Sequence, residues 1–304
     1  MSESPRKLAT LPGRSESLRM LDEVDTKVPR KTEDAVASIY TGMFPDGDRA
    51  FVRQAFEWAD MFFTGQNAEY LAIDARYHDF EHTLQGTLCL ARLLHGRHEA
   101  KAEPALSRKA FELGLLAILF HDTGYLKKRD DTEGTGAKYT PIHVMRSADV
   151  VRDFLSGKGW SDADVTAMQN MIRCTGVNVD LKAIPFQNDE ERMVGYALST
   201  ADLLGQMAAA DYVGKLPVLY AEFAEAAKVE GADAGRVCPF TSAEDMMRKT
   251  PVFWEGYVLP KLELDFGGLY KFLSKPYPDG PNGYMQRVER NMAMLRDMTG
   301  ALAR

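Results

Sequence analysis

The sequence has few cysteines, no long apolar run and no excess of basic residues. Its three cysteines, Cys89, Cys174 and Cys238, are far apart and lack C-x-x-C spacing. This pattern argues against a thiolate zinc site and is typical of buried thiols in a reducing compartment. The formal charge of −7 argues against binding of nucleic acid polymers or anionic lipid, which usually need a basic surface. No stretch resembles a signal peptide or a membrane span. We therefore predict a cytoplasmic protein whose partners are neither nucleic acid polymers nor membranes.

Strand-like alternation is also scarce, and apolar residues recur at helical spacing from about residue 33 onward. The segment AFELGLLAILF (Ala110–Phe120) is apolar nearly all round, which predicts the buried centre of a domain. Ser161 with Asp164, and Asn188 with Glu191, have the spacing of residues that cap helix starts. The predicted fold class is therefore all-α.

Three segments are predicted along the chain. Residues 1–33 are rich in Ser, Pro, Arg, Lys and Glu and are expected to form a flexible tail. Residues 34–212 are expected to form the helical core, for which a hydrophobic content of 45% is sufficient. Within this core we expect one helix to end near Gly96 and another to begin near His143. Residues 213–304 are expected to form a C-terminal helical extension packed on the core.

All six histidines lie between residues 78 and 143. In the stretch YHDFEHTLQ, His78 and His82 are four residues apart, so on one helix both imidazoles would project from roughly one face. The pair His121-Asp122 follows the most apolar helix, where an unpaired charged group would cost several kcal/mol. A divalent cation would satisfy both side chains, and imidazole with carboxylate is a ligand set for borderline to hard divalent metals.

Three further features each have two interpretations. Asp202 lies among Ala, Leu and Met, either as a buried group with a partner or as a carboxylate facing solvent. His143 is either a ligand of a second metal or a helix-start residue that makes a backbone hydrogen bond. The Gly-rich loop from Lys127 to Pro141 carries Lys128 and Lys138, and it either closes over a substrate phosphate or is a solvated surface loop.

The order His82, then His121-Asp122, then Asp202, each on a separate helix, resembles the HD superfamily of metal-dependent phosphohydrolases. The segment HDTGY resembles the HD-x-G turn of that superfamily, and HVMRSADVVRDFL resembles the helix that follows it. The resemblance covers about residues 77–212. Within the superfamily, YHDFEH is similar to the Y-H-N-x-x-H signature of class I cyclic nucleotide phosphodiesterases.

This resemblance implies an HD-type helical metal-binding core with additional C-terminal helices. His82, His121, Asp122 and Asp202 would bind one or two divalent cations, and Mg, Mn, Zn and Fe are not distinguished. His143 would contribute to the second of these cations. Asp122 would also act in catalysis by bridging the two cations.

The implied function is hydrolysis of a phosphorylated small molecule, first of all a nucleotide phosphodiester such as a 3′,5′-cyclic nucleotide. His78 would be the general acid, and Asp79, which replaces the Asn of the signature, is expected to favour its protonated form. One alternative is a di-iron oxygenase of the HD type, although no histidine follows His143 to complete such a centre. Another is an HD protein that senses a nucleotide without turnover. The oligomeric state is left open.

Overall fold

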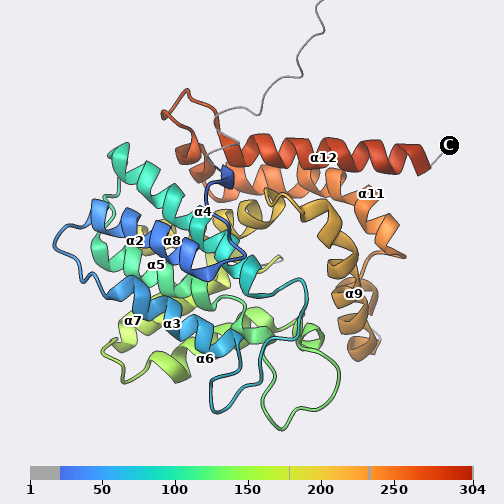
Figure 1. Cartoon of the computed structure of the whole chain (residues 1–304), viewed down its shortest axis with the longest axis horizontal. Coiled ribbons are helices and arrows are strands. Elements are labelled where there is room, and N and C mark those ends of the chain that lie inside the picture. Colours follow the sequence, from blue (N-terminus) through green and yellow to red (C-terminus); the bar gives the residue numbers. More distant parts are fainter. Residues whose placement is uncertain (1–20, 178, 232–233, 303–304) are drawn as a thin grey trace, which may run out of the picture.

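The computed structural model describes residues 21–177, 179–231 and 234–302. Within these ranges the chain is all-helical and forms no strand (Figure 1), which confirms the predicted fold class. The helices pack around a large hydrophobic core that draws on residues from Val36 to Leu295. None of the helices in these ranges combines the length and apolarity that a membrane crossing requires.

The helical elements follow one another through mostly short connections. In chain order they are α2 (Pro29–Met43), α3 (Phe51–Phe63), α4 (Phe80–Glu99), α5 (Arg108–Phe120), η1 (Thr123–Tyr125), η2 (Gly136–Tyr139), α6 (His143–Leu155), α7 (Asp162–Arg173), η3 (Leu181–Ala183), α8 (Asp189–Met207), α9 (Tyr212–Glu230), α10 (Ala234–Val237), α11 (Ala243–Phe253), η5 (Trp254–Val258), η6 (Lys261–Asp265), η7 (Leu269–Leu273) and α12 (Gly283–Leu302).

The predicted helix starts are confirmed. The Ser161 hydroxyl accepts the backbone N–H of Asp164, and the Asp164 carboxylate accepts the N–H of Ser161, so the two residues form a capping box at the start of α7. The Asn188 side chain caps α8 by accepting the N–H of Glu191. Helix α6 begins at His143. Helix α5 is buried along nearly its whole length, as its apolar sequence predicts.

The helix stop predicted at Gly96 is wrong, because α4 continues to Glu99. A Cβ at Gly96 would lie 2.0 Å from the carbonyl oxygen of Phe272, a residue of η7. The glycine is therefore needed for a close approach between two segments and not for a left-handed helix end.

The tail predicted for residues 1–33 is also placed too far along the chain. Residues 1–20 lie outside the described ranges, but α2 already begins at Pro29. Before it, Asp22 accepts two hydrogen bonds, of 2.8 and 2.9 Å, from the buried Arg287 of α12. Lys27 lies 3.2 Å from the carboxylate of Asp211. Residues 21–28 thus bind to α12 and to the connection between α8 and α9 through charged side chains.

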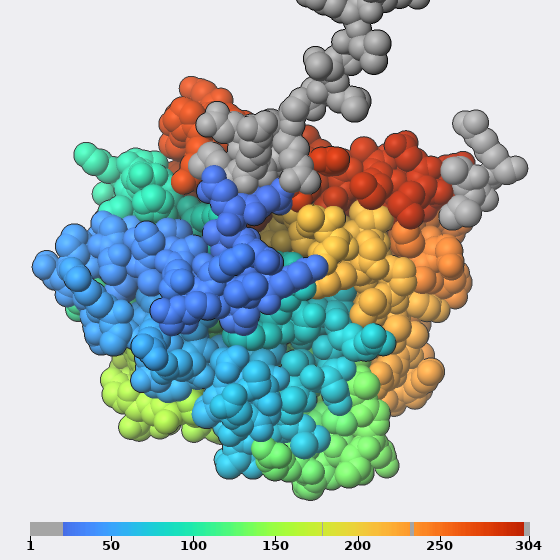
Figure 2. All heavy atoms as spheres, viewed as in Figure 1, coloured from blue at the N-terminus to red at the C-terminus, as the bar shows by residue number. Residues whose placement is uncertain are grey.

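Helices α4 and α8 cross at backbone contact in the centre of the molecule. A Cβ at Gly205 of α8 would lie 2.8 Å from the backbone carbonyl of Gln85 in α4, and a Cβ at Gly86 would lie 3.7 Å from the Cα of Asp202. Small residues at both positions let the two helices approach closely, and this crossing brings the start of α4 next to Asp202. The C-terminal helices α9, α11 and α12 lie together on one side of this centre (Figures 1 and 2).

Candidate metal centre

Four of the predicted metal ligands converge on one point. His82 is on the first turn of α4, His121 ends α5, Asp122 follows it, and Asp202 projects from α8. The Nε2 atom of His82 lies 3.1 Å from Oδ2 of Asp122 and 3.3 Å from Oδ1 of Asp202. The Nε2 atom of His121 lies 3.3 and 3.4 Å from the same two oxygens. Asp202 is therefore a member of the cluster, and its solvent-facing interpretation is wrong.

The cluster fits a divalent cation. Within the part of the chain that the structure describes, the buried Nε2 atom of His121 and Oδ2 atom of Asp122 have no hydrogen-bond partner outside the cluster, a costly arrangement for a structural cluster. Ligands at about 2.1 Å from a metal lie about 3.0–3.4 Å apart in octahedral or tetrahedral geometry, which agrees with the distances within the cluster. His82, His121 and Asp122 alone place ligand atoms within 4.8 Å of one another.

Backbone carbonyls fix the orientation of two imidazoles. Nδ1 of His121 lies 2.7 Å from the carbonyl oxygen of Ile118. A carbonyl can only accept, so this nitrogen carries the hydrogen, and Nε2 is left to face Asp122 and Asp202. Nδ1 of His143 donates to the carbonyl of Thr140 in the same way, at 2.6 Å. Such a bond on the opposite ring nitrogen is the usual support of a metal-binding histidine.

The charges within the cluster reinforce one another. Burial alone would raise the pKa of Asp122 and Asp202, but the neighbouring charge of His121, together with hydrogen bonds from His82, lowers the pKa of both carboxyl groups below their usual range. Burial alone would lower the pKa of His82, but hydrogen bonds to the two aspartates raise it to about 10. The metal-free cluster thus keeps both carboxylates ionised. Against the effect of burial, the two aspartates raise the pKa of both His82 and His121, so a cation would displace protons from these two imidazoles.

His143 lies on the other side of Asp122. Its Nε2 atom is 3.9 Å from Oδ1 of Asp122, whereas Oδ2 of the same carboxylate faces His82 and His121. Both predicted roles of His143 are therefore compatible, since its Nδ1 makes the backbone bond at the start of α6 and its Nε2 faces the cluster. Burial lowers the pKa of His143 and favours the neutral imidazole, the form that binds metals.

His78 lies close to the cluster but not on the predicted helix. Helix α4 begins at Phe80, so His78 precedes it, in the bend formed by residues 76–79. The centroid of its ring is 5.3 Å from that of His82. The ring stacks on Tyr125 at 4.4 Å, and Tyr125 stacks on His143 at 4.6 Å. The shared face expected from spacing is wrong, and stacking on Tyr125 orients the imidazole instead.

The partner of His78 is Glu222, which sequence reasoning missed. Its Oε2 atom lies 2.6 Å from Nδ1 of His78, and its Oε1 accepts the backbone N–H of Tyr77 at 2.6 Å. Burial would raise the pKa of Glu222, but the charge of His78 and these hydrogen bonds lower it below its usual range. Glu222 comes from α9, within the predicted C-terminal extension, and its only sequence signal is a carboxylate among apolar residues.

Asp79 and Glu81 have structural partners. Oδ1 of Asp79 accepts the backbone N–H of His82 at 2.9 Å and caps α4. Lys215 of α9 lies 2.9 Å from Glu81 and 3.9 Å from Asp79. The carboxylate in contact with His78 is therefore that of Glu222, and not that of Asp79, the residue expected from the sequence to act on His78.

The two lysines predicted to bind substrate lie between η1 and α6, with Lys138 inside η2. Lys138 donates to Asp131 at 2.5 Å and to the carbonyl of Glu133 at 2.7 Å, so its ammonium group is held within the loop. Lys128 is exposed, and its backbone pairs with Tyr70. Neither lysine belongs to the cluster, and their contact with a phosphate stays a prediction.

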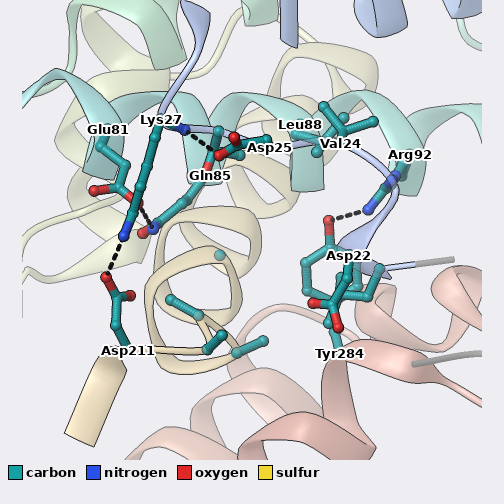
Figure 3. A pocket seen from close by; sticks show the side chains of 16 residues that line it. Asp22, Val24, Asp25, Lys27, Glu81, Gln85, Leu88, Arg92, Asp211 and Tyr284 are labelled. Atoms are coloured by element: carbon teal, nitrogen blue, oxygen red, sulfur yellow. Dashed lines mark hydrogen bonds and ion pairs between the residues drawn. The ribbon is translucent and has the colours of Figure 1, made fainter. Parts of the chain in front are cut away.

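A pocket of about 510 Å³ neighbours the cluster without containing its ligands. It is lined by Glu81 and Arg92 of α4, by the end of α8 and by residues 21–27 (Figure 3). Lys27 reaches across it to Asp211, and Arg92 donates to the hydroxyl of Tyr284 at 3.2 Å. The pocket and the cluster thus use different residues of the same two helices.

Comparison with known proteins identifies a family. The model of Npun_R2479-like proteins matches residues 53–268, which is more than half of the chain. A search of curated proteins finds no match. The matched range contains the whole cluster as well as His78 and His143, and it runs beyond residue 212 through α9, so Glu222 is included. The chain therefore belongs to the Npun_R2479-like family.

Proposed function

We propose that the chain is a metal-dependent hydrolase of phosphate esters, of the HD type that its motifs resemble. The preferred substrate is a nucleotide phosphodiester such as a 3′,5′-cyclic nucleotide. The observation that carries the proposal is the convergence of two imidazole nitrogens and two carboxylate oxygens in a buried cluster. Two buried atoms of the cluster have no hydrogen-bond partner outside it among the described residues, and a cation would satisfy both.

When bound, a divalent cation would polarise a phosphoryl oxygen and lower the pKa of a water molecule. The chain's own residues prepare the site for it. Asp122 and Asp202 supply negative charge, and the Ile118 carbonyl holds His121 in the tautomer whose Nε2 can bind a metal. Asp122 can ligate on both sides, since its two oxygens face different imidazoles.

His78 is the proposed general acid. Its Nδ1 is engaged by Glu222, so Nε2 is the atom that can donate a proton to a departing oxygen. The buried carboxylate of Glu222 holds Nδ1 of the ring at 2.6 Å, and Tyr125 holds its plane by stacking. This arrangement supports acid catalysis beside the cluster, where the leaving group would be released.

The test combines metal analysis with a substrate screen. The purified full chain is assayed for bound metals and then with cyclic and linear nucleotides in the presence of Mg²⁺, Mn²⁺ or Fe²⁺. His121→Ala removes a cluster residue, and His98→Ala serves as the matched control because His98 is exposed on α4. Turnover of a phosphoester that is lost in His121→Ala and kept in His98→Ala supports the proposal.

Other outcomes identify the alternatives. An EPR-active di-iron signal with consumption of O₂ supports the oxygenase. Tight binding of a nucleotide without product supports the sensor. Failure of the wild-type chain to bind any divalent metal would overturn the metal centre itself.

The choice of a cyclic nucleotide depends on the YHDFEH motif and is tested separately. Cyclic nucleotides should be hydrolysed faster than the corresponding nucleoside monophosphates at equal concentration. The reverse order would leave a phosphohydrolase with a different substrate.

A further inference from the structure

One face of helix α9 contacts several of the segments that surround the candidate active site. Lys215, Glu222 and Glu225 are seven and three residues apart, a spacing that places them on the same side of a helix. Lys215 binds Glu81. Glu222 binds the Tyr77–His78 segment. Glu225 has no part in the proposed chemistry, and it binds the loop that lies between η1 and α6.

The contact of Glu225 with this loop has two hydrogen bonds. Its Oε1 accepts the backbone N–H of Thr135 at 2.5 Å, and its Oε2 accepts the Thr135 hydroxyl at 2.8 Å. The preceding Gly134 has a φ of +53°, and a Cβ there would lie 2.8 Å from Oε1 of Glu225. A glycine is therefore required for the backbone to present Thr135 to the carboxylate. We call this pair of bonds the Glu225–Thr135 latch.

A second carboxylate, that of Asp74 between α3 and α4, binds the same turn. Oδ1 of Asp74 accepts the N–H of Gly136 at 2.6 Å, and Oδ2 lies 3.1 Å from the ammonium group of Lys127. Lys127 also donates to the carbonyl of Gly134 at 2.7 Å. Asp74 belongs to the connection between α3 and α4, whereas Glu225 belongs to α9. The lower end of α9 lies beside this green loop (Figure 1). The turn is thus fixed between two parts of the fold.

The fixed turn leads directly to His143. From Thr135 the chain continues through η2 to Thr140. The carbonyl oxygen of Thr140 accepts a hydrogen bond of 2.6 Å from Nδ1 of His143. A Cβ at Gly136 would lie 1.9 Å from the carbonyl oxygen of Tyr125, so the loop also lies directly against Tyr125. Tyr125 and His143 are the two rings that stack in line with His78. A shift of Thr135 would therefore be transmitted to the rings beside the cluster.

We propose that Glu225 is a positioning residue of the active site. By binding Thr135 it fixes the backbone that orients His143 towards Asp122. It also connects this backbone to α9, the helix whose Glu222 contacts His78. The catalytic consequence of this inference rests on the proposed function, whereas the structural consequence for His143 does not.

The experiment compares Glu225→Ala and Glu225→Gln with Glu230→Ala in the full-length chain. Glu230 is exposed at the end of the same helix, so its replacement removes the same charge without touching the latch. Three quantities are measured: hydrogen exchange of the peptide spanning Thr135 to Tyr139, the rate at which diethyl pyrocarbonate modifies His143, and kcat and KM for the best phosphoester. Unchanged exchange in α5 verifies that a variant is folded.

In Glu225→Ala we expect exchange of the loop peptide to accelerate about 10-fold or more, because bonds to a carboxylate are lost. We also expect faster modification of His143 and a fall in kcat of about 10-fold with little change in KM. Glu225→Gln should be intermediate, since its amide oxygen can still accept one of the two bonds. Glu230→Ala should match the wild type.

Two results would overturn the inference. In one, exchange and His143 modification in Glu225→Ala equal those of the wild type. In the other, exchange accelerates while His143 modification and kcat stay unchanged, so that Glu225 only braces the loop. If the wild type hydrolyses no phosphoester but both structural readouts respond as expected, the positioning of His143 is supported and the proposed function fails.

Discussion

Glu222→Gln should separate acid catalysis from metal binding. The substitution keeps the shape of the side chain, and its amide oxygen can still accept the N–H of Tyr77. It removes the negative charge 2.6 Å from Nδ1 of His78, in a side chain only 5% exposed. A hydrogen bond to a charged group contributes about 1.5–3 kcal/mol, which corresponds to a fall in kcat of about 10- to 150-fold.

The assay is steady-state hydrolysis of the phosphoester found in the screen, together with the metal content of the purified variant. The metal content should match the wild type, because Glu222 contacts His78 and not the cluster. KM should change little, and Glu230→Gln, on the exposed end of α9, should behave like the wild type. A wild-type kcat in Glu222→Gln would refute the role of the pair in proton transfer, and loss of the metal would show that Glu222 acts through the cluster.

Three further predictions concern the cluster and the helix crossing. Asp122→Asn should weaken metal binding by about 100-fold or more, measured by titration with Mn²⁺, because it removes the carboxylate that faces both sides of the site. In the metal-free protein the protonated His82, whose pKa is raised from 6.5 to about 10, stabilises the fold fully below about pH 6.5. Thermal unfolding in EDTA should therefore show a Tm that falls from pH 6.5 to 10, and a flat profile would contradict the assignment. Gly205→Ala should destabilise the chain by about 1–3 kcal/mol in urea unfolding, because its methyl group meets the Gln85 carbonyl, whereas Gly214→Ala, with open space around it, should not.

The cluster was predictable because each member conflicts with its local sequence. His121 and Asp122 end a helix that is otherwise apolar, and Asp202 interrupts a run of small and apolar residues. Burial of such groups is costly enough that a partner is required, and the partners found are one another. The helix caps were predictable for a similar reason, since a cap is satisfied within four residues.

The residues that sequence reasoning missed depend on distant contacts. Glu222 meets His78 across 144 positions in the chain, and nothing within α9 specifies which surface its acidic residues will meet. Gly96 satisfies the local pattern of a helix end, yet its function is to admit the Phe272 carbonyl. In both cases one of the two contacting residues lies in the last third of the chain, and only packing specifies the contact.

The start of α4 is a different case, because its signal lies within the local sequence. Asp79 lies three residues before His82, which is the spacing of a cap that accepts the third N–H of a helix. This pattern places His78 before the helix. The four-residue spacing of His78 and His82 matches one helical turn, but the capping residue Asp79 lies between them and starts the helix after His78.

Charge leads to a final prediction about the order of binding. The chain is acidic, and Asp122, Asp202 and Glu222 place three carboxylates around the proposed reaction site. Lys138 is neutralised by Asp131, and Lys215 by Glu81. The imidazoles of His82 and His121 offset two of these carboxylates, so a phosphate would gain its main attraction from a bound cation. Calorimetric titration of the chain with a nucleotide in EDTA should detect at least about 10-fold weaker binding than in saturating Mn²⁺. Equal affinity in both buffers would show that the nucleotide binds through groups outside the cluster.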